Sequence, residues 1–236
     1  MSLKSILVEK NKQIDILINQ FSEAYSDMYP AIFKEIQSVF KKGIFEESVI
    51  RDIFRRGGVD DLVVGFIDEF AVVYDFSKKL SKELGVGFNL ASVTNEKLDA
   101  ALVQIENNFN RLTNKYVNEL TTAGLNANLA DMKFQDVVRS LASIVEDSSR
   151  RFIAEAYTGI TQFDRALNYN LFKESLIEKY YYFGPSDDKT RQICQDALND
   201  PKQQTGWTID DINNSETTFI ECGGYNCRHE WLPLVE

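Results

Sequence analysis

Apolar residues in the N-terminal part of the chain recur at intervals of three and four, which is the spacing of one face of an α-helix. The first such stripe runs through residues 2–28, and Lys10 is its one break. Pro30 predicts the end of this helix, because a proline inside a helix removes a hydrogen bond and crowds the preceding turn. Two shorter helices are expected over residues 30–42 and 46–56.

Longer stripes follow. Residues 60–84 predict one helix that ends at the glycines of segment 85–87. The most regular stripe repeats apolar residues in the a/d fashion of a coiled coil: Leu98, Leu102, Ile105, Phe109, Leu112 and Tyr116. The last stripe drifts slightly along its helix: Phe134, Val138, Leu141, Val145, Phe152 and Ala156. Short turns between the stripes favour the core of an antiparallel bundle, although a long stripe could instead pack on a partner protein.

Near residue 180 the pattern changes from helical periods to aromatic residues, turn formers and closely spaced polar residues. Helices are expected over residues 189–198 and 208–213. Segments 217–222 and 228–234 have the composition of strands. This last part of the chain therefore predicts a small α+β module.

These patterns predict a mainly α chain in three parts. An elongated antiparallel helical body is expected over residues 1–147, and a connecting helix over residues 148–178. A small α+β module that contains the Cys and His residues follows over residues 179–236. Residues 180–183 and Trp231 are predicted to form the core of this module.

The composition narrows the classes of function. A formal net charge of -10 repels nucleic-acid phosphates and anionic lipid unless a basic patch is segregated. The longest apolar runs, in segment 62–74, are interrupted by Asp68 and Glu69 and are too short to span a membrane. The N-terminal residues do not resemble a secretory signal, so a reducing cytoplasm is expected, where cysteines are thiols or metal ligands.

All cysteines and the only histidine of the chain lie near its C-terminal end. They are Cys194, Cys222, Cys227 and His229. Three thiolates and one imidazole form a full tetrahedral ligand set for a structural zinc ion, with no open position for a catalytic water. The spacing C-x4-C-x-H places a turn between two ligands, and Gly223 and Gly224 permit the backbone conformation that such a turn needs.

Other interpretations of this cluster stay open. The cysteines could be reduced thiols that only pack in a core. Cys222 and Cys227 could instead form a disulfide. A hydrolase could use Cys227 or Cys194 with His229, although the sequence marks no oxyanion hole for it.

Two arginines lie beside the cysteine-rich elements. Arg191 belongs to the first predicted helix of the module, and Arg228 directly follows Cys227. Each is expected to pair with Asp187 or Glu230, or to donate to a loop carbonyl, inside the module. A partner's carboxylate or phosphate is the alternative acceptor.

The same residues carry a resemblance to a known family. Segments 180–194 and 222–233 resemble the C-terminal signature of the phage Mu F-like minor head proteins, also called head morphogenesis proteins. That signature pairs an Asp-x-x-Thr-Arg-x-x-Cys segment with a final Asn-Cys-Arg element. The matching positions here are Asp187, Thr190, Arg191 and Cys194, followed by Asn226, Cys227 and Arg228. The helix predicted over residues 148–178 also resembles the helix before the signature.

The resemblance implies a structural, non-enzymatic virion protein of a tailed phage. It implies a place at the portal vertex, where the protein assists head assembly, DNA packaging or ejection, and an earlier stay in the host cytoplasm during assembly. The implied partners are the portal protein and other capsid proteins, with local contact to packaged DNA as a further implied interaction. The alternatives are a Cys- or metal-dependent hydrolase that uses Cys227, Cys194 and His229, and a zinc-stabilised adaptor that binds other proteins.

Overall fold

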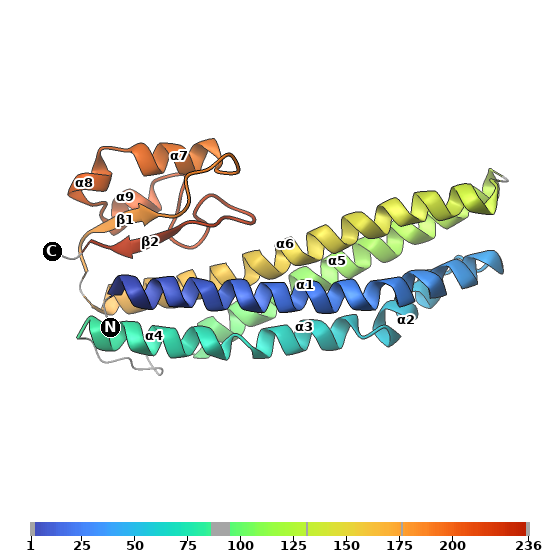
Figure 1. The fold of residues 1–236 in the computed structure, drawn as a ribbon, viewed down its shortest axis with the longest axis horizontal. Helices are drawn as coiled ribbons and strands as arrows, with labels where there is room; N and C mark the ends of the chain where they lie inside the picture. Colours follow the sequence, from blue (N-terminus) through green and yellow to red (C-terminus); the bar gives the residue numbers. More distant parts are fainter. Residues whose placement is uncertain (1–2, 86–94, 131, 176, 235–236) are drawn as a thin grey trace. The chain divides into compact units, whose positions relative to one another are not determined.

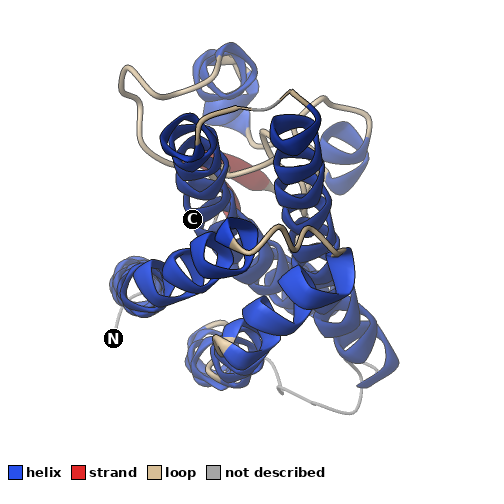
Figure 2. Cartoon of the chain, turned by 90° about the vertical axis from the view of Figure 1, so that its right-hand side faces the viewer, coloured by secondary structure: helices blue, strands red, loops and turns tan. Residues whose placement is uncertain are grey.

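The computed structural model describes residues 3–85, 95–130, 132–175 and 177–234. Its elements in chain order are α1 (Leu3–Lys41), α2 (Glu47–Arg56), α3 (Val59–Asp68), α4 (Ala71–Glu83), α5 (Asn95–Leu129), α6 (Phe134–Glu174), β1 (Tyr180–Phe183), α7 (Gln192–Asn199), α8 (Lys202–Thr205), α9 (Ile209–Asn213) and β2 (Glu230–Pro233). Figures 1 and 2 show this arrangement, in which helices dominate and the two strands lie together. The expected class, mainly α with a small α+β part at the C-terminal end, is confirmed.

Helix α1 continues through Pro30, so the predicted end of the first helix at this residue is wrong. Pro30 is exposed, whereas Tyr25, Ile32 and Ile36 on another face of the helix are buried. Packing of this apolar face on both sides of the proline outweighs the local cost of the missing N–H.

The single helix predicted over residues 60–84 is instead two helices, α3 and α4, with an interruption beside Phe70. Phe66 in α3 packs against Phe21, with ring centroids 4.8 Å apart. Phe70 packs against Phe163, with ring centroids 5.3 Å apart. The interruption lets the two aromatic residues enter different cores, which a continuous apolar stripe in the sequence does not reveal.

The chain divides into two compact units that do not follow the order of the sequence. The helical unit comprises Asp15–Glu69 and Leu102–Ala156, and the C-terminal unit comprises Met1–Ile14, Phe70–Ala101 and Tyr157–Glu236. The predicted boundaries after residues 147 and 178 differ from this division. The difference arises because α6 is one continuous helix, and its C-terminal part belongs to the same unit as the small module.

Aromatic side chains from α1, α5 and α6 form the core of the helical unit. The ring centroid of Phe152 lies 4.8 Å from that of Tyr25 and 5.8 Å from that of Phe109. Phe109 and Tyr116 of the predicted a/d stripe are buried in this core, while the side chain of Leu98 lies outside the described residues. The described part of this stripe therefore packs within the chain, as the bundle interpretation expects.

In the C-terminal unit, β1 and β2 form an antiparallel pair in which Tyr182 lies opposite Trp231. Tyr180, Tyr182 and Trp231 are almost fully buried, which confirms the predicted aromatic core of the module, whereas Phe183 is exposed. The paired strands thus place Tyr182 next to Cys227 and His229, which lie in the loop before β2.

Of the two predicted strands, segment 228–234 contains β2, whereas the strand predicted over 217–222 is wrong. This segment forms bends and turns that continue past its last residue, Cys222, whose backbone φ is 48°. A φ in the left-handed region interrupts a strand, and the β-type composition of the segment does not prevent it.

Lys10, the break in the first apolar stripe, is a buried cation in the C-terminal unit. Its Nζ donates to Asp164 Oδ2 at 2.6 Å and to Glu230 Oε2 at 3.0 Å. Asn11 Nδ2 donates to the other oxygen of Glu230 at 3.0 Å. Burial disfavours the ammonium form, but the two carboxylates outweigh it and raise the pKa of Lys10. This network joins the N-terminal end of α1 to α6 and β2.

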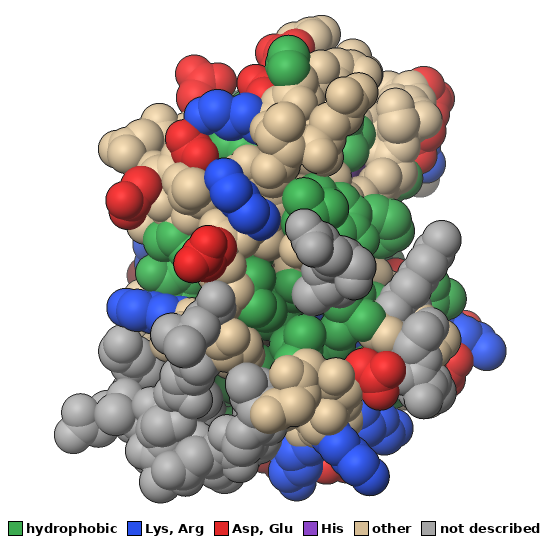
Figure 3. Space-filling view, turned by 90° about the vertical axis from the view of Figure 1, so that its left-hand side faces the viewer, with side chains coloured by type: hydrophobic (Ala, Val, Ile, Leu, Met, Phe, Trp, Pro, Cys, Tyr) green, Lys and Arg blue, Asp and Glu red, His purple; other side chains and the backbone are tan. Residues whose placement is uncertain are grey.

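Acidic and basic side chains are interspersed on the face drawn in Figure 3. The described part of that face therefore offers no continuous basic surface to a polyanion. Within the residues described above, none of the helices has both the length and the apolar character of a membrane span.

Candidate metal centre

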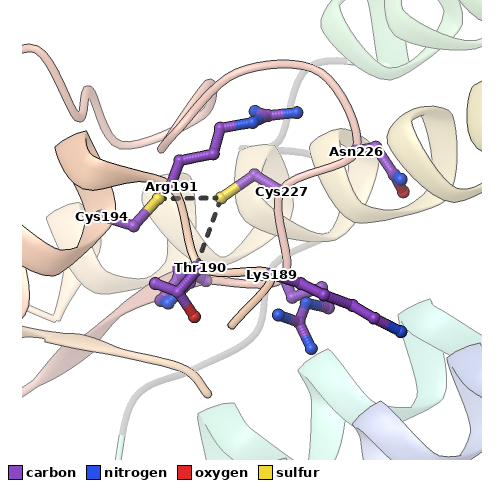
Figure 4. Close-up of a pocket in the computed structure, with 8 residues that line it drawn as sticks. Lys189, Thr190, Arg191, Cys194, Asn226 and Cys227 are labelled. Carbon is purple, nitrogen blue, oxygen red and sulfur yellow. Dashed lines mark hydrogen bonds between the residues drawn. The ribbon is translucent and has the colours of Figure 1, made fainter. Parts of the chain in front are cut away.

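Cys194, Cys227 and His229 converge in the C-terminal unit. Cys194 lies in the first turn of α7, and the other two residues lie in the loop that leads into β2. The Sγ atoms of Cys194 and Cys227 are 3.8 Å apart, and Cys227 Sγ is 3.6 Å from His229 Nδ1. All three donor atoms lie within 4.8 Å of one another, and Figure 4 shows the two sulfur atoms pointing toward each other. Such a group could hold a metal ion.

Two of the three separations between donor atoms match those of one tetrahedral ion. Zinc binds sulfur at about 2.3 Å and nitrogen at about 2.0–2.1 Å, which places two sulfurs about 3.8 Å apart and sulfur and nitrogen about 3.5 Å apart. The observed separations are 3.8 Å and 3.6 Å. These two pairs of donor atoms therefore need not move to bind one ion.

The ring of His229 is held in an orientation that suits a ligand. Its Nε2 lies 2.9 Å from the carbonyl oxygen of Pro185, and because a carbonyl only accepts, Nε2 carries the proton. Nδ1, the other ring nitrogen, faces Cys227 Sγ at 3.6 Å, as in metal sites whose second ring nitrogen donates to a carbonyl. The ring stacks on Tyr182 with centroids 5.2 Å apart, and a side chain at Gly184 would overlap it.

The turn that carries Cys227 is a compact loop over residues 222–227. Its backbone has φ values of 48° at Cys222, 85° at Gly224 and 56° at Asn226. The Gly223 N–H donates to Cys227 Sγ at 3.2 Å, and a Cβ at Gly223 would overlap Cys194 Sγ. The two glycines therefore have different roles, since Gly224 supplies a left-handed conformation and Gly223 supplies space and a donor.

Two arginines fix this loop through its carbonyl groups. Arg191 donates to the carbonyl oxygen of Gly223 at 2.6 Å and also to that of Tyr225. Arg165, buried on α6, donates to the carbonyl oxygens of Ile220 at 3.1 Å and Cys227 at 2.6 Å. The contacts of Arg191 agree with the expectation that it donates to loop carbonyls inside the module.

Asp187 organises the turn before α7. The carboxylate of Asp187 accepts from both terminal nitrogens of Arg228, at 2.5 Å and 2.8 Å, and from the backbone N–H of Lys189 at 3.0 Å. The hydrogen bonds from Arg228 are the main cause that lowers the pKa of Asp187 below its usual range. Thr190 Oγ1 accepts from the Asp187 N–H at 2.9 Å and donates to the carbonyl of Pro185 at 2.9 Å. Arg228 therefore pairs inside the module, as expected.

Cys222, the fourth predicted zinc ligand, lies outside the group of three donor atoms. Its Sγ is buried and lies 3.6 Å from the carbonyl oxygen of Phe219, and burial raises the pKa of its thiol to about 12. The backbone of this residue has a left-handed φ of 48°. All three cysteines are free thiols, so the disulfide between Cys222 and Cys227 is absent.

Three residues that the sequence did not single out take part in the site. The hydroxyl of Tyr182 lies 3.5 Å from Cys194 Sγ and 3.8 Å from Cys227 Sγ. Thr158 Oγ1 accepts from the backbone N–H of Asn226 at 2.9 Å, and Arg165 donates to the loop carbonyls. The alternation of buried residues along β1 could have indicated Tyr182, whereas no sequence signal marks Thr158 or Arg165 on a long helix.

The donor atoms border an open pocket of about 340 Å³. Its lining residues are Lys189, Thr190, Arg191, Cys194, Asn226, Cys227, Arg228 and His229. Burial opposes ionisation of Cys227, but hydrogen bonds from His229 and Gly223 and the charge of Arg165 outweigh it and lower the pKa of this thiol to about 6. A thiolate at neutral pH is the form that binds a metal ion.

Comparisons of the chain with protein-family models, with curated proteins and with solved structures find no match.

Proposed function

We propose that this chain is a structural minor head protein of a tailed phage that acts at the portal vertex and assists head assembly, DNA packaging or ejection. The signature resemblance suggests this role, and the contacts of the signature residues support a structural one. Asp187 pairs with Arg228, Thr190 closes the same turn, and Arg191 donates to the loop over residues 222–227. The observation that carries the proposal is this single network, in which the signature residues bind one another and the loop over residues 222–227.

We also propose that zinc is the ion held by Cys194, Cys227 and His229. Two sulfurs and one imidazole nitrogen form a borderline-soft donor set, which zinc prefers over the hard cations calcium and magnesium. When bound, zinc would crosslink α7 to the loop before β2 and would stabilise the module. The proposed role of the ion is structural.

Portal and other capsid proteins are the proposed partners, in the virion and, during assembly, in the host cytoplasm. The net charge of -10 favours protein contacts and restricts any contact with DNA to a local patch. Large apolar side chains are exposed at the connection between α5 and α6: Leu125, Leu129, Met132 and Phe134. Exposed apolar residues gathered in this way are typical of protein interaction surfaces.

The test is co-expression of the untagged chain with the portal protein encoded in the same genome. The proposal predicts that the two proteins co-sediment and that Leu129→Asp weakens this association, because a charge is placed in the apolar surface. Val103→Asp is the matched control, since Val103 is also exposed on α5 but lies away from that connection. Portal assemblies that exclude the unaltered chain would contradict the proposal.

A hydrolase is the second candidate, favoured by the position of Cys194, Cys227 and His229 on the wall of an open pocket. Among the described residues that line this pocket there is no Asp or Glu to act as a general base for a metal-bound water. Turnover of a chromogenic ester or phosphate by the zinc-loaded protein, lost in Cys227→Ala, would favour the hydrolase over the structural role.

A further inference from the structure

The metal centre has three protein donors, and a tetrahedral ion takes four ligands. The residue that would close the site, Cys222, lies outside the donor group. The three donors that do converge, Cys194, Cys227 and His229, are all on the wall of the open pocket. The fourth ligand can therefore come from outside the chain, through that pocket.

The other surroundings of the two sulfur atoms are already filled. The Tyr182 hydroxyl approaches both sulfurs, at 3.5 Å and 3.8 Å, and Tyr182 is not among the residues that line the pocket. The Gly223 N–H donates to Cys227 Sγ at 3.2 Å. These groups act as outer partners of the thiolates, which leaves the pocket as the side from which a further ligand enters.

The charge of the pocket favours a negatively charged ligand. Lys189, Arg191 and Arg228 line it, and among its described lining residues there is no carboxylate. Arg228 is paired with Asp187, whereas Arg191 donates to uncharged carbonyl groups that do not neutralise it. A zinc ion with two thiolates and one neutral imidazole has no net charge, so the basic side chains attract an anion to the open position.

We propose that the pocket over the metal centre binds a small oxyanion, a carboxylate or a phosphate group, with one oxygen in the fourth coordination position of the ion. Lys189 and Arg191 supply the balancing charge. This inference rests on the metal centre proposed above and not on the phage role. The net charge of -10 on the whole chain disfavours a polyanion as the ligand.

Cobalt(II) substitution of the untagged, full-length protein tests this inference, because the visible bands of cobalt respond to its fourth ligand. Addition of acetate to the cobalt-loaded protein should shift these bands in a saturable manner, and inorganic phosphate is the second arm. The anion that saturates at the lower concentration identifies the class of ligand. Lys189→Ala should weaken that anion about two- to fivefold, the loss expected for one exposed charge, whereas the exposed Lys173→Ala, which does not line the pocket, should leave it unchanged.

A closed site gives a different set of results. If neither anion changes the cobalt bands, and Cys222→Ala removes part of the thiolate-to-cobalt absorption, Cys222 completes the site and the inference is wrong. Equal effects of Lys189→Ala and Lys173→Ala on anion affinity would show that Lys189 does not bind the anion. Failure of the unaltered protein to bind cobalt would overturn the metal centre itself, while cobalt binding without an anion effect would overturn this inference alone.

Discussion

The three thiols of the chain differ because their surroundings differ. Cys227 receives hydrogen bonds from His229 and Gly223 that stabilise its thiolate, whereas burial dominates at Cys222 and at Cys194 and raises the pKa of both thiols. At the scale of residues, the site therefore has one thiol, Cys227, that is ionised near neutral pH, and one, Cys194, that ionises with difficulty until a metal ion replaces its proton. Cys222, outside the donor group, keeps its proton.

Alkylation of the metal-free protein should show this order. Because only the thiolate reacts, iodoacetamide should modify Cys227 with a midpoint near its pKa of about 6, while Cys222, with a pKa of about 12, stays protected at neutral pH. Peptide mapping by mass spectrometry after alkylation at graded pH measures both. Modification of Cys222 before Cys227 would refute this order of pKa values.

The lowered pKa of Cys227 also contributes to the stability of the folded protein. This contribution is complete above the usual pKa of 9.0 and is lost as pH falls through about 6.

Gly223→Ala should weaken metal binding by at least tenfold. The added Cβ would overlap Cys194 Sγ and lie 3.1 Å from Cys227 Sγ, so the two donors would have to separate. Competition with a chelator measures the affinity. Gly65→Ala is the control, because its Cβ meets nothing within 4 Å and alanine is favoured over glycine in a helix. Equal metal affinity in both variants would show that Gly223 has no role in the site.

The sequence predicted the participation of Cys194, Cys227 and His229, because scarce residue types gathered in one segment indicate a shared function. It also predicted Cys222, which lies outside the group of converging donor atoms, and spacing alone cannot show that this residue adopts a φ of 48°. Tyr182 was predicted only as a core residue, and its contact with the sulfurs escaped notice for a related reason. Its hydroxyl reaches the sulfurs only after β1 pairs with β2, and the pairing is a long-range event.

At the scale of elements, the loop over residues 222–227 is short and irregular, and its shape depends on side chains from α7 and α6. Arg191 donates to the carbonyl groups of Gly223 and Tyr225 in the loop. Arg165 donates to the carbonyl group of Cys227 and to that of Ile220, just before the loop. Because such a loop has no regular secondary structure to hold it, these donors determine where Cys227 lies. Local composition suggested a strand for segment 217–222, and it could not reveal the turns that these long-range donors stabilise.

Arg191→Ala should lower metal affinity about tenfold, the effect expected when an outer partner of a ligand is lost. The helix content should stay unchanged, since Arg191 supports a loop and precedes α7. Chelator competition and far-ultraviolet circular dichroism give the two readings. Arg139→Ala is the matched control, because the exposed Arg139 pairs only with Asp136 on α6 among the contacts described for it. An unchanged metal affinity in Arg191→Ala would show that the contacts of Arg191 with the loop do not position the metal ligands.

At the scale of the whole molecule, the C-terminal module shares one compact unit with the first residues of the chain and with the C-terminal part of α6. Residues at the two ends of the chain share one unit, and the buried network of Lys10, Asp164 and Glu230 joins them. The helical periods predicted most helices correctly, but they could not predict this division. Lys10 interrupts an apolar stripe, and its two partners lie 154 and 220 positions away.

Lys10→Met should destabilise the protein by about 3–5 kcal/mol, because it leaves Asp164 and Glu230 buried without their cation. Chemical denaturation followed by circular dichroism measures the loss. Lys12→Met is the control, since Lys12 is exposed on the same helix. Adding Asp164→Asn and Glu230→Gln to Lys10→Met should restore part of the stability by removing the unpaired charges. A loss below about 1 kcal/mol in Lys10→Met would contradict a role for this network in joining the two ends of the chain.

The proposed metal centre is tested by the metal content of the untagged, full-length protein and its single variants. We expect about one zinc ion per chain in the unaltered protein and in Cys222→Ala, and none in Cys194→Ala or Cys227→Ala, with helix content retained in all four. Unaltered protein that carries no metal after purification and zinc addition, or loss of zinc from Cys222→Ala, would contradict this expectation.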